Sequence, residues 1–176
     1  MTINGIAVLF GLGTSIAFGA SVPARVALCF TPGDTCIPRI VSAIASANSR
    51  ILVQGYTFGL GPIPNALVAA KSRGVEIRVI LDRSEYELGH SRGAAVLLGA
   101  GIPVQLDGGP GGYFSIAHTK AIMIDDELTI GGSFNYSEHA DKDSVEDAAF
   151  MYGQELTGEF EAAWSRRWAV SVPLRQ

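Results

Sequence analysis

Five residues in the C-terminal half of the sequence have the types and spacing to act together on a phosphate group. His118 and Lys120 are separated by one residue, so in an extended strand their side chains point to the same side. Ser133 and Asn135 have the same spacing and can present a hydroxyl and an amide together. Glu146 follows further along the chain. An imidazole, an ammonium, two hydrogen-bond donors and a carboxylate suit a tetrahedral phosphoryl group.

These side chains predict covalent phosphodiester hydrolysis. The imidazole of His118 can attack phosphorus and form a phosphohistidine, which divides one difficult displacement into two easier steps. Lys120, Asn135 and Ser133 can donate to the non-bridging oxygens and stabilise the charge of the transition state. Glu146 is the candidate to accept a hydrogen bond from the other imidazole nitrogen and fix its tautomer.

A metal-dependent mechanism fits this sequence less well. Lys120 lies two residues from His118 and would repel a divalent cation, and no cluster of His, Asp and Glu has the spacing of familiar zinc sites. Asp125 is at an odd offset from His118, so it should leave the shared face or lie where the strand turns. We therefore expect neither a metal nor a cofactor.

The complete pattern resembles the signature of the phospholipase D superfamily, and in particular its small, single-motif bacterial endonucleases of the Nuc type. The residues that carry the resemblance are His118-x-Lys120, four further residues and Asp125, then Gly132-Ser133-x-Asn135. The resemblance extends from about residue 25 to residue 168. It implies a metal-independent phosphodiesterase in which Asp125 is structural. The site residues that it implies are His118, Lys120, Ser133, Asn135 and Glu146.

The same resemblance implies a homodimer. In that family one histidine attacks phosphorus while a second protonates the leaving oxygen, and this chain has one His-x-Lys motif. His90 and His139 lie in polar segments without such a motif, and we expect both to be solvated. A symmetric dimer would bring His118 of each subunit to the two-fold axis. The rate should then show a bell-shaped dependence on pH, with apparent pKa values that belong to the pair.

The expected fold class is mixed α/β, a central and largely parallel sheet with added antiparallel strands and helices on both faces. Short apolar runs alternate with helical stretches of about ten residues up to residue 106, which favours parallel strands joined by crossovers. The expected strands there are 25–30, 51–56, 75–81 and a possible edge strand at 102–106, and the expected helices are 38–47, 65–74 and 94–100. Later strands at 119–124, 128–131 and 148–152 are closely spaced and predict an antiparallel addition, closed by a helix at 154–169.

Residues 1–20 differ from the rest of the sequence. From Ile3 to Ala20 there is no charge, and the stretch ends in small residues, as in a secretory signal peptide. The segment before the apolar run has no Lys or Arg, so a membrane anchor or a buried N-terminal element remains an alternative. We expect residues 21–176 to form a single phosphodiesterase domain, exported and periplasmic.

The two cysteines agree with export. Cys29 and Cys36 flank a Pro-Gly-Asp turn, and an even count near a turn in an exported chain favours a local disulfide. Two reduced thiols are the alternative.

Composition narrows the choice of substrate. Charged residues are 17% of the chain and the net charge is -4, which disfavours indiscriminate binding to nucleic acid, so phosphate chemistry must rest on a local site. DNA or RNA is the expected substrate, because the chain shows no obvious interfacial helix. The alternatives are a phospholipid phosphodiesterase, which would use the same motif, and a non-catalytic module that binds nucleic acid.

Overall fold

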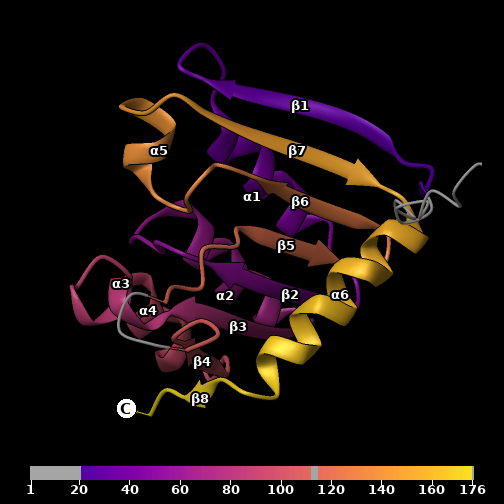
Figure 1. The fold of residues 1–176 in the computed structure, drawn as a ribbon. Helices are drawn as coiled ribbons and strands as arrows, with labels where there is room; N and C mark the ends of the chain where they lie inside the picture. The colour runs from indigo at the N-terminus through magenta and orange to yellow at the C-terminus, as the bar shows by residue number, and fades with distance from the viewer. Residues whose placement is uncertain (1–20, 112–114, 176) are drawn as a thin grey trace, which may run out of the picture.

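The computed structural model describes residues 21–111 and 115–175, and these residues are built around one central sheet (Figure 1). The sheet in this part of the chain has eight strands in the order β1-β7-β6-β5-β2-β3-β4-β8. Its strands are β1 (Arg25–Thr31), β2 (Arg50–Gly55), β3 (Glu76–Asp82), β4 (Val104–Asp107), β5 (Ala121–Ile124), β6 (Leu128–Gly132), β7 (Glu146–Tyr152) and β8 (Val172–Pro173). The predicted leader, residues 1–20, lies outside the described residues.

Helices cover both faces of the sheet, as the sequence predicted. The helices in the described ranges are α1 (Cys36–Ala45), α2 (Pro62–Ser72), α3 (Arg83–Glu87), α4 (Gly93–Gly99), α5 (Glu138–Lys142) and α6 (Gln154–Trp168). α6 crosses one face, while α1 and α2 lie behind the opposite face (Figure 1). Among the described residues, no helix has both the length and the apolar character that a membrane crossing requires.

The central strands β2 and β3 carry apolar side chains on both faces because both faces are covered. Ile51 and Val53 of β2 pack into the core shared with α1, α2 and α4. Leu52 points the other way and packs with Ile80 of β3 against α6. Trp164 of α6 is buried there, and its Nε1 donates to the backbone oxygen of Val53 at 2.9 Å. The sheet and α6 are thus joined by apolar packing and by one buried hydrogen bond.

The mixed fold class is confirmed, but the expectation of a largely parallel sheet is wrong. Of the seven strand pairings among the described residues, β2–β3 and β3–β4 are parallel and the other five are antiparallel. The first strand, β1, pairs with β7 at one edge of the sheet instead of with β2. A strand–helix–strand pattern does not specify whether its two strands are neighbours, and here α1 joins an edge strand to a central one.

β4 is not at the edge of the sheet, where the sequence predicted the strand at 102–106 to lie. β8 pairs antiparallel with β4, with Gln105 opposite Pro173, so β4 is covered along part of its length. β8, α3 and α5 were not expected from the sequence. Each has five residues or fewer, too short for a periodic apolar pattern to appear.

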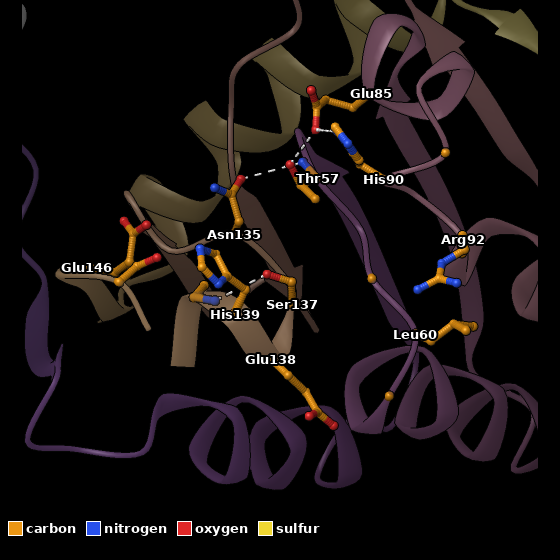
Figure 2. A pocket seen from close by; sticks show the side chains of 15 residues that line it. Thr57, Leu60, Glu85, His90, Arg92, Asn135, Ser137, Glu138, His139 and Glu146 are labelled. Carbon is orange, nitrogen blue, oxygen red and sulfur yellow. Dashed lines mark hydrogen bonds and ion pairs between the residues drawn. The ribbon is translucent and has the colours of Figure 1, made fainter. Parts of the chain in front are cut away.

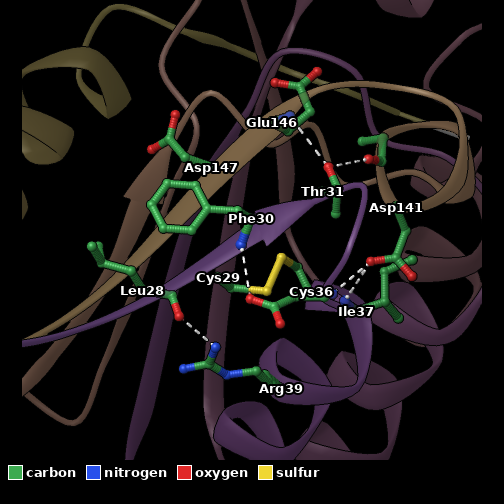
Figure 3. The surroundings of a disulfide bond; sticks show 12 residues. Leu28, Cys29, Phe30, Thr31, Cys36, Ile37, Arg39, Asp141, Glu146 and Asp147 are labelled. Carbon is green, nitrogen blue, oxygen red and sulfur yellow. Dashed lines mark hydrogen bonds between the residues drawn. A yellow bond between two sulfur atoms is a disulfide. The ribbon is translucent and has the colours of Figure 1, made fainter.

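A disulfide joins the end of β1 to the start of α1. Cys29 and Cys36 are both fully buried and are bonded to each other (Figure 3). Asp141 of α5 reaches the same corner, where its Oδ1 accepts from the backbone N–H groups of Cys36 and Ile37 at 2.7 and 3.0 Å. Because Thr35 makes no side-chain cap, Asp141 satisfies the first N–H groups of α1 from a distant part of the chain.

Candidate active site

Three chain segments meet at one end of the sheet: the segment before β5, the turn after β6 and the start of β7. The three strands are antiparallel neighbours, with Ala121 opposite Gly131 and Gly132 opposite Ala148. This pairing puts the beginning of β5 beside the end of β6, which in turn lies beside the beginning of β7. The predicted site residues carried by these segments are His118, Lys120, Ser133, Asn135 and Glu146.

His118 and Lys120 are in contact at this end of the sheet. Nζ of Lys120 lies 2.9 Å from Nε2 and 3.1 Å from Nδ1 of His118, and it donates to the backbone oxygen of His118 at 2.9 Å. The expected strand begins later than predicted, at Ala121, so both residues lie just ahead of β5. The contact places a primary ammonium beside the imidazole that would attack phosphorus.

Lys120 is held in an environment that disfavours its charge. The residue is only 6% exposed, and burial lowers the pKa of its ammonium, although the nearby carboxylates of Glu146 and Glu85 oppose that shift. A partly desolvated ammonium interacts more strongly with a phosphoryl oxygen than a solvated one, because water screens it less. This position therefore suits stabilisation of charge in a transition state.

Tyr56 forms one wall of the site and was not identified from the sequence. It directly follows β2, and its ring lies edge-on to His118 with centroids 4.4 Å apart. Nζ of Lys120 lies 5.0 Å from the centroid of the same ring. Burial raises the pKa of the Tyr56 hydroxyl, and the neighbouring carboxylate of Glu85 adds to this effect. Tyr56 thus restrains the imidazole and the ammonium together.

Asp82 positions the backbone that leads to His118. It is fully buried at the end of β3, where one carboxylate oxygen accepts from the N–H of Glu85 at 3.0 Å and so caps α3. The other oxygen accepts from the N–H of Ala117, next to His118, at 2.7 Å. The sequence carried a signal for this residue, since an acidic side chain directly follows the apolar run at 75–81.

The cavity in front of His118 has a volume of about 720 Å³. All five predicted site residues line it: His118, Lys120, Ser133, Asn135 and Glu146. Oγ of Ser133 accepts from the N–H of Asp147 at 3.0 Å, and Oδ1 of Asn135 faces the N–H of Thr57 at 3.5 Å. With its oxygen turned towards Thr57, the Asn135 side chain has its amide nitrogen available to donate to a ligand.

The contact expected between Glu146 and His118 is not formed within one chain. Among the hydrogen bonds of the described residues, none joins the Glu146 carboxylate to that imidazole. Glu146 begins β7, which is separated from β5 by β6, so the two backbones are roughly 10 Å apart. Glu146 lines the same cavity without orienting His118 of its own chain.

Asp125 is removed from the cavity, in agreement with its odd offset. It lies in the turn between β5 and β6 with a positive φ of 51°. Its carboxylate accepts from the N–H groups of Asn48, Ser49 and Arg50 at 2.6, 2.8 and 2.9 Å. Burial would raise its pKa, but these backbone hydrogen bonds and the Ser49 hydroxyl outweigh that effect and lower the pKa to about 2.

Within residues 21–111 and 115–175, no group of three or more His, Cys, Asp or Glu side chains is placed to hold a metal ion.

The fold and the site together define a class of phosphodiester hydrolase. A family model described as cardiolipin synthase, PLD-like domain, matches residues 40–168. The chain belongs to this phospholipase D-like family. It is 37% identical over 145 residues to a phospholipase D of Rickettsia conorii, a match that covers 82% of this chain and 70% of the relative.

Solved structures agree with this assignment. Nuc from Salmonella typhimurium, a phospholipase D family member, has a TM-score of 0.78 and 30% identity, and the match covers 88% of this chain and 100% of Nuc. NucT from Helicobacter pylori has a TM-score of 0.79 at 21% identity, covering 86% of this chain and 100% of NucT. The match to Nuc shows that this chain is a phospholipase D family protein of the Nuc type. The match to NucT shows that the two proteins share a fold.

Proposed function

We propose that this protein is a metal-independent endonuclease that cleaves nucleic acid through a phosphohistidine formed on His118. The observation that carries the proposal is the contact between His118 and the buried Lys120 in an open cavity. The likeness to Nuc, which matches this chain along the whole of Nuc, favours nucleic acid as the substrate.

The reaction has two displacements at phosphorus. An imidazole nitrogen of His118 attacks, the bond from phosphorus to the leaving oxygen breaks, and a second imidazole gives that oxygen its proton. The second imidazole then takes a proton from water, whose oxygen attacks the phosphohistidine and releases His118. Lys120 and Asn135 line the cavity and would donate to the non-bridging oxygens in both steps.

The second imidazole is proposed to come from another copy of the chain. Among the described residues that line the cavity, His118 is the only histidine. A two-fold axis beside the cavity would supply His118 of the partner subunit and complete the site.

The surface beside the cavity supports this arrangement. Val26, Leu28 and Phe30 alternate along the edge strand β1, share one face, and are 52%, 50% and 54% exposed. Val26 lies opposite Met151, which lines the cavity, so these side chains lie on the cavity side of the sheet. A row of exposed apolar side chains on an edge strand is typical of an interface.

Export is also proposed. The buried disulfide between Cys29 and Cys36 supports it, because such bonds persist in oxidising compartments such as the periplasm.

The decisive experiment measures hydrolysis of bis(p-nitrophenyl) phosphate and plasmid DNA by the full chain in the presence of EDTA. His118→Ala should remove both activities, since it removes the imidazole that attacks phosphorus in the proposed mechanism. Lys71→Ala is the control, because that side chain is exposed at the end of α2 and lines neither cavity of the site. Retained DNA cleavage in His118→Ala would refute the mechanism.

The dimer is tested separately by Leu28→Glu. The charged side chain should prevent the apolar faces from meeting, giving a monomer by sedimentation and a loss of activity without loss of secondary structure. A wild-type protein that is monomeric and fully active at assay concentration would overturn the shared site.

A phospholipid diester is the second candidate, because the Rickettsia relative is a phospholipase D. Competition separates the two: DNA should inhibit hydrolysis of the small diester, and less so as salt is raised. Turnover of the small diester with no DNA cleavage and no inhibition by DNA would favour the lipid.

A further inference from the structure

A second cavity adjoins the one that holds His118. It has a volume of about 770 Å³, and its lining includes Asn135 and Glu146, which also line the first cavity. Figure 2 shows these two residues on one side of it, with His90 and Arg92 on the other. A substrate bound at His118 and extending beyond the reacting phosphate can therefore continue into this space.

His90 is held there by a buried carboxylate. Glu85 is 8% exposed, and its Oε2 accepts from the hydroxyl of Thr57 at 2.7 Å and lies 3.1 Å from Nδ1 of His90 (Figure 2). An ionised carboxylate can only accept, so this contact requires the proton to be on Nδ1. Nε2, on the opposite side of the ring, is then the nitrogen available to a ligand. The His90 side chain is 56% exposed to the solvent that a ligand would displace.

A chain of polar contacts links this histidine to the catalytic cavity. The N–H of Thr57 faces Oδ1 of Asn135 at 3.5 Å, and the hydroxyl of the same Thr57 donates to Glu85. Thr57 thus contacts both the side chain that faces the reacting phosphate and the carboxylate that holds His90. The two cavities are fixed relative to each other by these side chains as well as by the fold.

Charge in the second cavity is distributed unevenly. Arg92 lines it and is exposed, and no ion pair among the described residues includes it. Of the carboxylates, Glu138 is paired with Lys142 at 2.8 Å and Glu85 is engaged by His90. Glu146 remains, at the junction with the first cavity. The wall formed by His90 and Arg92 is therefore the part suited to an anion.

We infer that His90 and Arg92 form a second phosphate subsite, which binds the phosphodiester next to the one that His118 attacks. The inference rests on the proposed nuclease function, because it requires a substrate with consecutive phosphates. Arg92 would contribute a permanent charge and His90 a directed hydrogen bond from Nε2 when the ring is protonated. Productive binding of a polynucleotide would then depend on two adjacent phosphates.

The test compares a substrate with several phosphates and one with a single phosphate. The full chain, with EDTA present, is assayed on a short single-stranded oligodeoxythymidylate and on bis(p-nitrophenyl) phosphate. In His90→Gln and Arg92→Gln, KM for the oligonucleotide should rise about tenfold more than KM for the small diester. The control is Lys71→Gln, an exposed residue at the far end of α2 with the same change of charge, which should alter neither value.

The salt dependence of KM provides a second test, because it would not change if His90 and Arg92 had only a structural role. Loss of one phosphate contact should reduce the slope of log KM for the oligonucleotide against log salt by about 0.7 in Arg92→Gln. Equal effects on both substrates, with an unchanged slope, would overturn the subsite and leave the nuclease intact. A wild-type protein that hydrolyses the small diester but not the oligonucleotide would instead refute the proposed function, and the subsite with it.

Discussion

The two ends of β5 carry residues of one sequence motif, but these residues lie in opposite hydrogen-bonding environments. Ahead of the strand, His118 and Lys120 face an open cavity, and the Lys120 ammonium is buried beside an imidazole and a tyrosine ring. After the strand, Asp125 is saturated by three backbone N–H groups and a hydroxyl. A strand of four residues thus separates groups kept available for a ligand from a group that is fully engaged in the fold.

This difference separates chemistry from stability within a short segment. Burial lowers the pKa of Lys120, so the fold works against the charge that it places in the cavity. The hydrogen bonds around Asp125 have the opposite effect and favour its ionised form, with a pKa of about 2. Substitutions of the side chains that face the cavity at the first end should therefore reduce activity at constant stability. Substitutions of Asp125 at the second end should reduce stability at constant activity.

The largest expected effect is that of Lys120→Met on catalysis. Removing the ammonium should lower kcat by roughly 10³-fold, in the range found when a transition-state donor is lost. Because the charge is buried, its removal should leave the midpoint of thermal unfolding unchanged or higher. Steady-state kinetics and calorimetry on the same preparation check both. A variant that loses stability in step with activity would break the separation between the two ends.

Gly132→Ala should damage the catalytic end through the backbone. Gly132 has φ of +148°, and a Cβ there would collide with the backbone oxygen of Asp147. The unfolding free energy should fall by about 2 kcal/mol, and Ser133 and Asn135 should be displaced. Gly158→Ala in α6 is the control: its Cβ meets no atom within 4 Å, so the same substitution should stabilise slightly. Equal unfolding midpoints for the two variants would contradict this account.

Asp125→Asn should cost about 1–2 kcal/mol of folding free energy at neutral pH, with solvent screening taken into account. The pKa of Asp125 is lowered from 3.8 to about 2, so its stabilisation is present above 3.8 and is lost as pH falls towards 2. Urea unfolding at several pH values should show a smaller loss of stability across that window in the variant. Asp126→Asn, one residue along and more exposed, is the comparison. If Asp125→Asn leaves the activity per folded molecule unchanged, Asp125 contributes to stability alone, in contrast to Lys120.

The smallest expected effect is on a second alkaline limb of the rate, at higher pH than the limb that belongs to the histidine pair. Since the pKa of Lys120 is lowered from 10.5, activity that needs its ammonium should be lost as pH rises through a value below 10.5. The carboxylate of Glu146 raises that pKa, so Glu146→Gln should move the limb to still lower pH. The quantity to compare is the pH at which kcat falls to half of its maximum, not the maximum value of kcat itself. A limb that moves upward in the variant would assign it to another group.

Much of the local structure could be predicted because it depends on short patterns. The apolar runs of β2 and β3 and the glycines that follow α2 and α4 are signals within a few residues of each element. The odd spacing between His118 and Asp125 was enough to predict that Asp125 leaves the shared face or lies where the strand turns. The spacing of His118 and Lys120 likewise predicted a shared face, although the strand begins one residue after Lys120.

What the sequence could not provide was the set of neighbours across the sheet. Tyr56 and Asp82 lie far from the motif in the chain, and only the pairing of β2 with β5 and β3 brings them to it. The same is true of His90, which is solvated as expected but is also held by a buried Glu85. Strand order depends on which surfaces pack best over the whole chain, so spacing along the sequence does not encode it.

The sequence by itself determined the side chains of the motif and the elements that carry them, because periodicity and spacing act over a few residues. Only the tertiary structure decided that β1 closes the edge beside β7, that Glu146 stays away from His118 of its own chain, and that a second cavity opens next to the first. These outcomes follow from long-range antiparallel pairing, in which residues distant in sequence become neighbours a few ångströms apart.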